Sequence, residues 1–295
     1  MTNSKSRVMS GLVPYLYLTP ALVVLAVFVF LPAVLVFLIS LFRWSYGTNP
    51  VWTGLGQYAL VLGSASFWQS AWISIVFAGG TVIVGTALAL LVALGLYGNV
   101  RGRGVLRTLY FVPYVMPVVA TATVWLWIFQ PQYGILDQII TRLGGPMLGW
   151  VQSPSLALVS LMIYTIWYTL GFTTLLFLAG LTNISPEVLE AARVDGAGGL
   201  TTFRRMIWPL LSPTTLFVLI VNTISTFQSF TQIYALTRGG PLNATTTVTY
   251  YLYETAFQYF HFGQGAAVGV VLFIFLSILT GVELLVTRRW VEFGQ

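Results

Sequence analysis

Long stretches without a single charged side chain dominate this sequence. Only 7% of the 295 residues are charged and 57% are hydrophobic, whereas soluble domains carry about 25% charged residues. Each of the longest charge-free intervals exceeds the roughly 20 residues that cross a bilayer as a helix. We therefore expect an all-α integral membrane protein. The intervals are 8–42, 44–100, 108–136, 143–186, 206–237 and 255–282.

One transmembrane helix is expected in each interval. The interval 44–100 opens with a polar, Gly-rich stretch, so its helix is placed late. Pro113 and Pro117 interrupt the third helix, and we expect a kink there rather than loss of the span, because neighbouring groups can re-satisfy the freed carbonyls. The expected spans are 15–41, 71–97, 108–129, 156–181, 207–235 and 265–286.

The distribution of cations predicts the orientation. Ten of the 13 Lys and Arg residues fall on one side of the six spans, and cations in short loops are retained in the cytoplasm. Both termini and the loop 182–206 are therefore expected to be cytoplasmic. The first apolar run is too long for a signal peptide and is interpreted as a retained helix. We expect a tail at 1–14, one membrane domain at 15–287 and a tail at 288–295.

Several chemistries lack the residues that they need. The chain has no cysteine, so disulfides and thiolate sites are excluded, and no metal-ligand cluster or paired carboxylates are evident. A Walker A loop needs a Gly-Lys pair, and the only lysine is Lys5, so we expect no ATP hydrolysis by this chain. The net charge of +6 is attributed to topology and anionic lipid, not to nucleic acid. The sole histidine, His261, lies among aromatic residues and is interpreted as interfacial.

Acidic residues concentrate in one loop. Glu187, Glu190 and Asp195 are three of the seven in the chain. Ser185-Pro186-Glu187 is typical of a helix start, with a capping Ser, Pro at the first position and an acid that complements the helix dipole. Gly196 stands where a left-handed residue would end this helix, and a second helix is expected from about Leu200 into the fifth span. A passive connector needs no such order, so a docking element is favoured over a solvated loop.

The sequence of this loop, "EAARVDGAGGLTTFRRMIWPL", resembles the EAA signature of permease subunits of ATP-binding-cassette (ABC) importers. Met206 and Trp208 depart from it, since Ile and Leu are usual there. Further similarity to the carbohydrate type of these permeases, the maltose and glycerol-3-phosphate systems, lies in "YLTPALVVLAVFVFLPAVLVFLISLF", "LYFVPYVMPVVATATVWLWIF" and "LTRGGPLNATTTVTYYLYETAFQYFHFGQGAA". The residues that match the signature in place are Glu190, Ala191, Ala192, Gly196 and Pro209.

This resemblance implies a fold, partners and a role for the loop. The fold would be a six-helix permease of the maltose type, which pairs with a distinct sister permease, two ABC ATPase subunits and an extracytoplasmic solute-binding protein. ATP and Mg²⁺ would be bound by the ATPases, with no cofactor on this chain. The loop would be a coupling helix that docks on an ATPase. The residues expected to couple are Glu190, Ala191, Ala192, Arg193, Asp195 and Gly196.

A polar stripe along the fifth expected span suggests a translocation pathway, since polar groups at membrane depth usually face a cavity or the bundle interior. Helix-to-helix hydrogen bonding is the alternative reading. In the fourth span, aromatic side chains including Trp167 could stack on a sugar ring. The expected pathway residues are Tyr168, Thr169, Phe172, Asn222, Ser225, Thr226, Ser229 and Gln232.

The sequence leaves more than one candidate for the substrate and for the energy source. A sugar or oligosaccharide fits an uncharged polar and aromatic lining, while glycerol 3-phosphate or a related polyol phosphate stays possible. An ion-coupled secondary transporter is the rival class, but no ionisable side chain lies deep in the expected spans and Glu283 is near a helix end. A membrane scaffold without transport would require the polar stripe to serve only helix packing.

Overall fold

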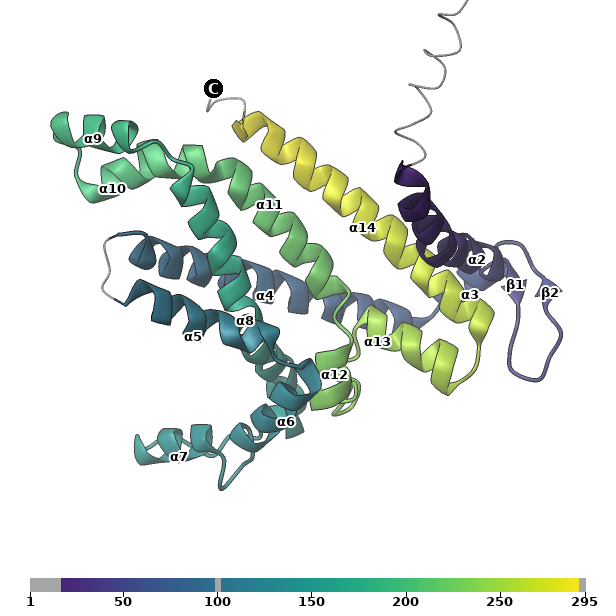
Figure 1. Cartoon of the computed structure of the whole chain (residues 1–295). Helices are drawn as coiled ribbons and strands as arrows, with labels where there is room; N and C mark the ends of the chain where they lie inside the picture. Colours follow the sequence, from purple (N-terminus) through teal and green to yellow (C-terminus); the bar gives the residue numbers. More distant parts are fainter. Residues whose placement is uncertain (1–16, 99–101, 292–295) are drawn as a thin grey trace, which may run out of the picture. The chain divides into compact units, whose positions relative to one another are not determined.

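The computed structural model describes residues 17–98 and 102–291, which are helical over most of their length (Figure 1). They fall into two compact units. The first unit comprises the described residues up to Ser64 together with Leu252–Leu272. The second comprises Ala65–Tyr251 and the described residues from Phe273 onward.

The first unit begins with a helix over Tyr17–Ile39, in which a π-helical turn precedes α2. A short antiparallel hairpin follows, with Phe42 opposite Trp52. The backbone joins it to the later segment of the same unit, because the Tyr46 N–H donates to the Phe260 carbonyl at 3.1 Å. The elements are η1 (Ala26–Phe30), α2 (Leu31–Ile39), β1 (Phe42–Arg43), β2 (Val51–Trp52), α3 (Gly56–Leu62), η4 (Glu254–Gln258) and the start of α14 (Phe262–Val291).

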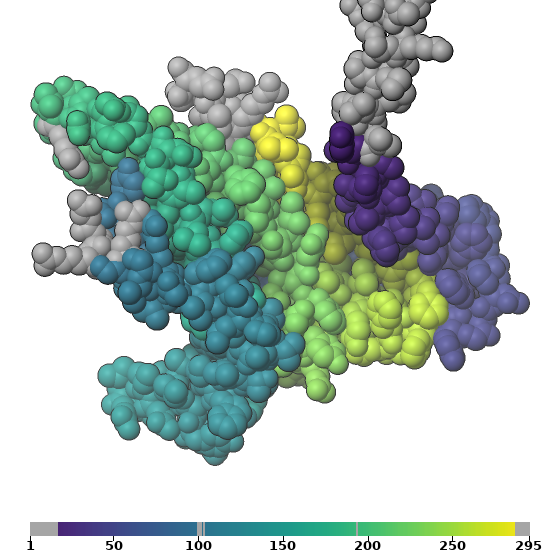
Figure 2. All heavy atoms as spheres, viewed as in Figure 1, coloured from purple at the N-terminus to yellow at the C-terminus, as the bar shows by residue number. Residues whose placement is uncertain are grey.

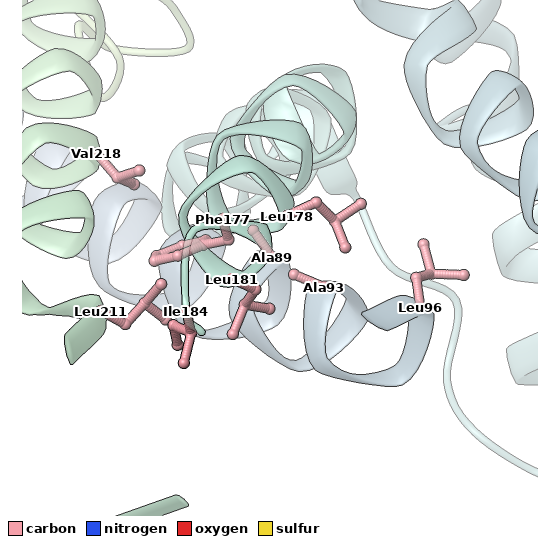
Figure 3. Packing of buried hydrophobic residues seen from close by; sticks show 9 residues of the cluster. All are labelled: Ala89, Ala93, Leu96, Phe177, Leu178, Leu181, Ile184, Leu211 and Val218. Carbon is pink, nitrogen blue, oxygen red and sulfur yellow. The ribbon is translucent and has the colours of Figure 1, made fainter. Parts of the chain in front are cut away.

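The second unit is built around three long helices, α4, α8 and α11, which pack against one another. Their shared core contains nine buried apolar side chains (Figure 3), which are Ala89, Ala93, Leu96, Phe177, Leu178, Leu181, Ile184, Leu211 and Val218. The unit also holds the rest of α14. In chain order, the elements from Ala65 to α13 are α4 (Ala65–Tyr97), α5 (Arg103–Val115), α6 (Val118–Ile128), α7 (Ile135–Arg142), η2 (Trp150–Gln152), α8 (Pro154–Thr182), α9 (Pro186–Val194), α10 (Gly199–Thr202), η3 (Phe203–Ile207), α11 (Trp208–Phe227), α12 (Thr231–Leu236) and α13 (Val248–Tyr253).

Five helices in the described residues are long and apolar enough to cross a membrane, and one bent pair passes the same test together. They correspond in order to the six expected spans, although α4 starts earlier than residue 71. The five helices are Tyr17–Ile39, Ala65–Tyr97, Pro154–Thr182, Gly199–Phe227 and Phe262–Val286. The expectation of a helical membrane protein is confirmed.

Where the third span was expected, the structure has two helices joined by a sharp bend rather than one kinked helix. Helices α5 and α6 meet at an angle of 100°. Met116 between them is extended, with ψ 148°, as a residue before proline tends to be. Pro117 also has no N–H to continue the helical ladder. The prolines predicted an interruption, but the bend is sharper than the expected kink.

The fifth span ends earlier than expected. We predicted one helix over 207–235, but α11 ends at Phe227 and a separate short helix, α12, begins at Thr231. No proline or glycine marks this break in the sequence. Its cause is therefore tertiary: the Thr249 hydroxyl donates to the Phe227 carbonyl at 2.7 Å, which supplies a partner for one of the carbonyls freed at the helix end.

Parts of the expected topology fall beyond the described residues. The tail 1–14, with Lys5 and Arg7, lies outside them, and so do Arg101 and residues 292–295. The backbone of α14 continues to Val291, so part of the expected tail 288–295 is helical.

A separate lobe of the second unit contains α7, and it stands out from the neighbouring helices in the space-filling view (Figure 2). A buried carboxylate organises this lobe. Asp137 is 1% exposed, and its Oδ1 accepts a 2.8 Å hydrogen bond from Trp150 Nε1. The Leu148 N–H lies 3.3 Å from the Asp137 Oδ2. Because this carboxylate is satisfied within the lobe, its role is structural, and we did not foresee it from the sequence.

Candidate functional site

A cavity of about 370 Å³ lies within the second unit, between α4, α8 and the junction of α11 with α12. Its lining combines hydroxyls, side-chain amides and aromatic rings, and no charged side chain contributes to it. The lining residues are Thr81, Val82, Gly85, Tyr114, Thr165, Tyr168, Thr169, Asn222, Ser225, Thr226, Gln228, Ser229, Phe230, Thr231 and Gln232.

The structure brings seven of the eight expected pathway residues together around this cavity. Tyr168 and Thr169 come from α8, while Asn222, Ser225 and Thr226 come from α11. Ser229 and Gln232 reach the same space although the helix is broken between Phe227 and Thr231, because the break keeps both side chains on the cavity side. They also contact each other, since Gln232 Nε2 donates to Ser229 Oγ at 2.6 Å. The stripe is therefore not one helical face, but its members still share one space.

Asn222 links three helices at the N-terminal end of the polar stripe. Its Nδ2 lies 3.3 Å from Thr173 Oγ1 of α8 and 3.5 Å from Thr86 Oγ1 of α4. Thr86 and Thr173 are buried, with 8% and 2% exposure. Hydrogen bonding between helices, the alternative reading of the stripe, thus applies to this one residue, which also lines the cavity.

Aromatic side chains form one wall of the cavity. Phe172 does not line it directly but stacks on Tyr114, with ring centroids 4.6 Å apart and planes 9° apart. Tyr114 itself faces the cavity from the end of α5. Trp167 packs against Trp125 at 5.3 Å and is not part of the lining. Phe172, which was expected among the pathway residues, therefore supports the Tyr114 ring from behind and is not part of the lining.

Two buried hydroxyls in this lining were missed from the sequence. Thr81 and Thr165 are 5% and 3% exposed. Within the described chain, neither Oγ1 has a hydrogen-bond partner. A signal existed in both helices, since Ser70, Ser74 and Thr81 recur on α4 at spacings of four and seven residues, and Thr165 lies four residues before Thr169 on α8. The cavity therefore offers donors and acceptors that a polar, uncharged ligand could satisfy.

The charged loop forms the helix, turn and helix that the sequence predicted. Helix α9 ends in a Schellman motif: Gly196 has φ +74°, and the Ala197 N–H donates to the Ala192 carbonyl at 2.9 Å. The next helix begins at Gly199 and runs into α11 through the π-helical turn η3. Figure 1 shows α9 and α10 together beyond the ends of α8 and α11.

The two faces of α9 differ in their exposure. Ala192 is 1% exposed and Leu189 packs against the apolar core, so this face points inward. The outward face presents Glu190 and Ala191, with Val194, which is 87% exposed. Asp195 and Gly196 are also exposed, while the Arg193 side chain lies outside the described residues. Of the residues expected to couple, Ala192 therefore packs inside this chain, and Val194 was not among them; the coupling role itself stays a prediction.

The Glu187 carboxylate caps the start of this helix. The Ser185 hydroxyl donates a hydrogen bond to it and holds the pKa of Glu187 below its ordinary value. The negative charge beside the first turn complements the helix dipole. Ser185 thus stabilises the start of α9, because its hydroxyl favours the ionised form of the Glu187 carboxylate.

Long apolar helices around an uncharged polar cavity, with an ordered charged loop outside, define a class: a polytopic membrane transport protein. The chain belongs to the family described as binding-protein-dependent transport system inner membrane component, which its residues 85–291 match. The resemblance noted in the EAA stretch is confirmed, and the chain is a multi-pass permease component of an ABC importer.

Two relatives align over almost the whole chain. The trehalose/maltose transport system permease protein MalF of Thermococcus litoralis is 35% identical over 290 residues, which are 97% of this chain and 97% of the relative. The sn-glycerol-3-phosphate transport system permease protein UgpA of Agrobacterium fabrum is 33% identical over 96% of this chain and 97% of the relative. Both are permease components of transport systems.

A solved structure shares the fold. It is a chain of the bacterial alginate ABC transporter in complex with an alginate pentasaccharide-bound periplasmic protein, with a TM-score of 0.84 and 18% identity. The likeness covers 97% of this chain and 98% of that chain. The two chains therefore share one fold over almost the whole part of this chain that the structure describes.

Proposed function

We propose that this chain is the subunit through which a sugar or oligosaccharide crosses the membrane, and that the cavity between α4, α8 and α11 is part of the path. The observation that carries the proposal is the uncharged lining, in which hydroxyls and amides alternate with aromatic rings. Sugars present many hydroxyls and apolar ring faces, which such a lining matches. A relative named for trehalose and maltose at 35% identity supports the same class.

Glycerol 3-phosphate or a related polyol phosphate is the second candidate. It is favoured by the relative named for sn-glycerol 3-phosphate, at 33% identity. A phosphate is usually bound by Arg, Lys or backbone N–H groups, and the cavity lining contains no cation. The neutral sugar is therefore preferred for this chain.

The rest of the machinery follows from the family. A sister permease completes the membrane core, since one chain presents one coupling loop and two ATPases need two. ATP and Mg²⁺ are bound by the ATPase subunits and hydrolysed there, with no cofactor on this chain. A solute-binding protein delivers the sugar from outside. In this arrangement the chain crosses the cytoplasmic membrane of a prokaryote six times, with both termini and the loop 182–206 inside.

The outward face of α9 is proposed to seat on an ATPase. Glu190 supplies an ionic or hydrogen-bonded anchor, while Ala191 and Val194 offer a small apolar surface. The tight turn at Gly196 fixes the angle between α9 and the helix that continues into α11. Because α11 also lines the cavity, movement of the loop is transmitted to the substrate path through one continuous element.

Uptake into proteoliposomes tests the proposal. The complete complex, with its binding protein outside, should accumulate radiolabelled sugar only when ATP is enclosed, and an uncoupler should have no effect. An ion-coupled secondary transporter predicts the reverse: uptake without ATP that collapses with the uncoupler. Screening sugars and polyol phosphates against the partner binding protein by thermal shift identifies the substrate to use, since a bound ligand raises apparent stability.

A further inference from the structure

The bend between α5 and α6 interrupts the helical hydrogen-bond ladder in the middle of the expected third span. Pro117 has no N–H to donate to the Pro113 carbonyl, which accepts instead from the Met116 N–H at 3.3 Å. Because Met116 is extended, the helical ladder does not continue from the Tyr114 and Met116 carbonyls into α6. Carbonyls left without a donor in an apolar medium are strongly unfavourable, so a broken span needs outside donors.

Two tyrosines one helical turn apart on α8 donate hydrogen bonds to backbone carbonyls on the two sides of the bend. The Tyr168 hydroxyl lies 3.1 Å from both the Tyr114 and the Met116 carbonyl oxygens, on the α5 side of the break. The Tyr164 hydroxyl donates to the Val118 carbonyl at 3.1 Å, on the α6 side, and shares a 2.8 Å hydrogen bond with Thr121. One face of α8 therefore holds both ends of the bend.

The close approach of α5 to α8 depends on the same face. Gly171, three residues beyond Tyr168, has no side chain, and a Cβ there would collide with the Tyr110 carbonyl oxygen. The Tyr114 ring then lies between Phe172, at 4.6 Å, and Tyr168, at 5.8 Å. Tyr114 is the α5 side chain that lines the cavity.

We propose that Tyr164 and Tyr168 are positioning residues, whose hydroxyls clamp the two ends of the broken third span and so hold the Tyr114 wall of the cavity in place. This assigns the Tyr168 hydroxyl to the backbone, whereas its ring still faces the cavity. The consequence for transport rests on the proposed function, but the clamp itself can be tested without any substrate.

The test compares Tyr164→Phe and Tyr168→Phe with the wild type, because phenylalanine keeps the ring and removes only the hydroxyl. Hydrogen exchange, measured by mass spectrometry on the complete complex in nanodiscs, reads the amides of residues 112–121. We expect about 3- to 10-fold faster exchange there in both variants, the effect of losing one hydrogen bond. The apparent KM for sugar uptake should rise by a similar factor, with Vmax within about twofold.

Tyr110→Phe is the matched control. Tyr110 lies on α5 itself, and across residues 17–98 and 102–291 no hydrogen bond from its hydroxyl is found, so exchange and KM should not change. Unchanged exchange in both test variants would overturn the clamp. Faster exchange with unchanged KM would overturn its role in positioning the cavity wall. Failure of the wild type to take up sugar would count against the proposed function, while the exchange comparison would still decide the clamp.

Discussion

Gly171 shows how a single residue sets the spacing of two helices. A Cβ at this position would collide with the Tyr110 carbonyl oxygen and lie 2.8 Å from the Phe111 Cα, both of them backbone atoms that cannot rotate away. We therefore predict that Gly171→Ala lowers the stability of the protein by about 1–3 kcal/mol, as overpacking does. Thermal unfolding of the purified complex measures the loss.

Gly79→Ala is the control for this prediction. Gly79 lies in α4, where an added Cβ meets no atom within 4 Å. Alanine favours a helix over glycine by up to about 1 kcal/mol, so Gly79→Ala should leave the melting temperature unchanged or raise it. Equal melting temperatures for the two variants would contradict the close contact at Gly171.

The pKa of Glu187 is the second prediction at the residue scale. Removal of the hydroxyl in Ser185→Ala should raise this pKa toward the ordinary value. Since the folded pKa of Glu187 is lowered, its contribution to stability is present above the unfolded pKa and is lost as the pH falls through the folded pKa. Carboxyl ¹³C NMR can follow it, because the chain has only five glutamates. An identical titration in both proteins would show that Ser185 does not act on Glu187.

At the scale of elements, the turn after α9 links the charged loop to α11. Gly196 has φ +74° and open space around it, so a side chain there meets only conformational strain, of about 1–2 kcal/mol for most residues. Asparagine tolerates this left-handed conformation better than alanine. We predict that Gly196→Ala weakens substrate-stimulated ATP hydrolysis by the complex, whereas Gly196→Asn retains most of it. Equal loss in both variants would mean that the turn's conformation is not what matters.

The elements also differ in how far the sequence predicts them. Apolar helices were predictable from charge-free runs, because a bilayer demands length and hydropathy whatever the neighbours are. The charged loop was predictable for a similar reason, since Pro186 and Gly196 act locally. The bend at Met116 was predictable in place but not in angle, because Tyr164 and Tyr168 on another helix stabilise it. The end of α11 at Phe227 carries no local signal at all.

The candidate site, too, has residues that the sequence predicts locally and residues whose place depends on tertiary contacts. Asn222 and Ser225 stand out as polar residues in an apolar helix, so their helical spacing pointed to a cavity. Tyr114 was not predicted, because its place in the cavity depends on the bend of another span and on the stack with Phe172. The buried position of Ala192 agrees with its place beside Leu189 on the apolar face of α9, whereas the 87% exposure of Val194 was not foreseen.

For the whole molecule, the proposed topology makes a prediction that the sequence is well suited to test. The chain has no cysteine, so single introduced cysteines report without background. Asn49 and Asn183 are both exposed and lie in connections proposed to face opposite sides of the membrane. In intact cells a membrane-impermeant maleimide that passes the outer wall should label Asn49→Cys and spare Asn183→Cys until the membrane is opened. Labelling of Asn183→Cys in intact cells would contradict cytoplasmic termini.

The central claim is that the sugar passes through the cavity at the junction of α11 and α12, and filling that cavity tests it most directly. Ser229 lines the cavity and is 7% exposed, whereas Ser277 lies on an exposed face of α14. Both variants, Ser229→Trp and Ser277→Trp, are compared in ATP-driven sugar uptake after equal assembly of the complex is verified. We predict that uptake falls at least about tenfold in Ser229→Trp, since a bulky ring obstructs the path, and a tenfold lower rate corresponds to a barrier raised by about 1.4 kcal/mol. Uptake should stay near the wild-type rate in Ser277→Trp. Wild-type uptake by a fully assembled Ser229→Trp complex would contradict the claim.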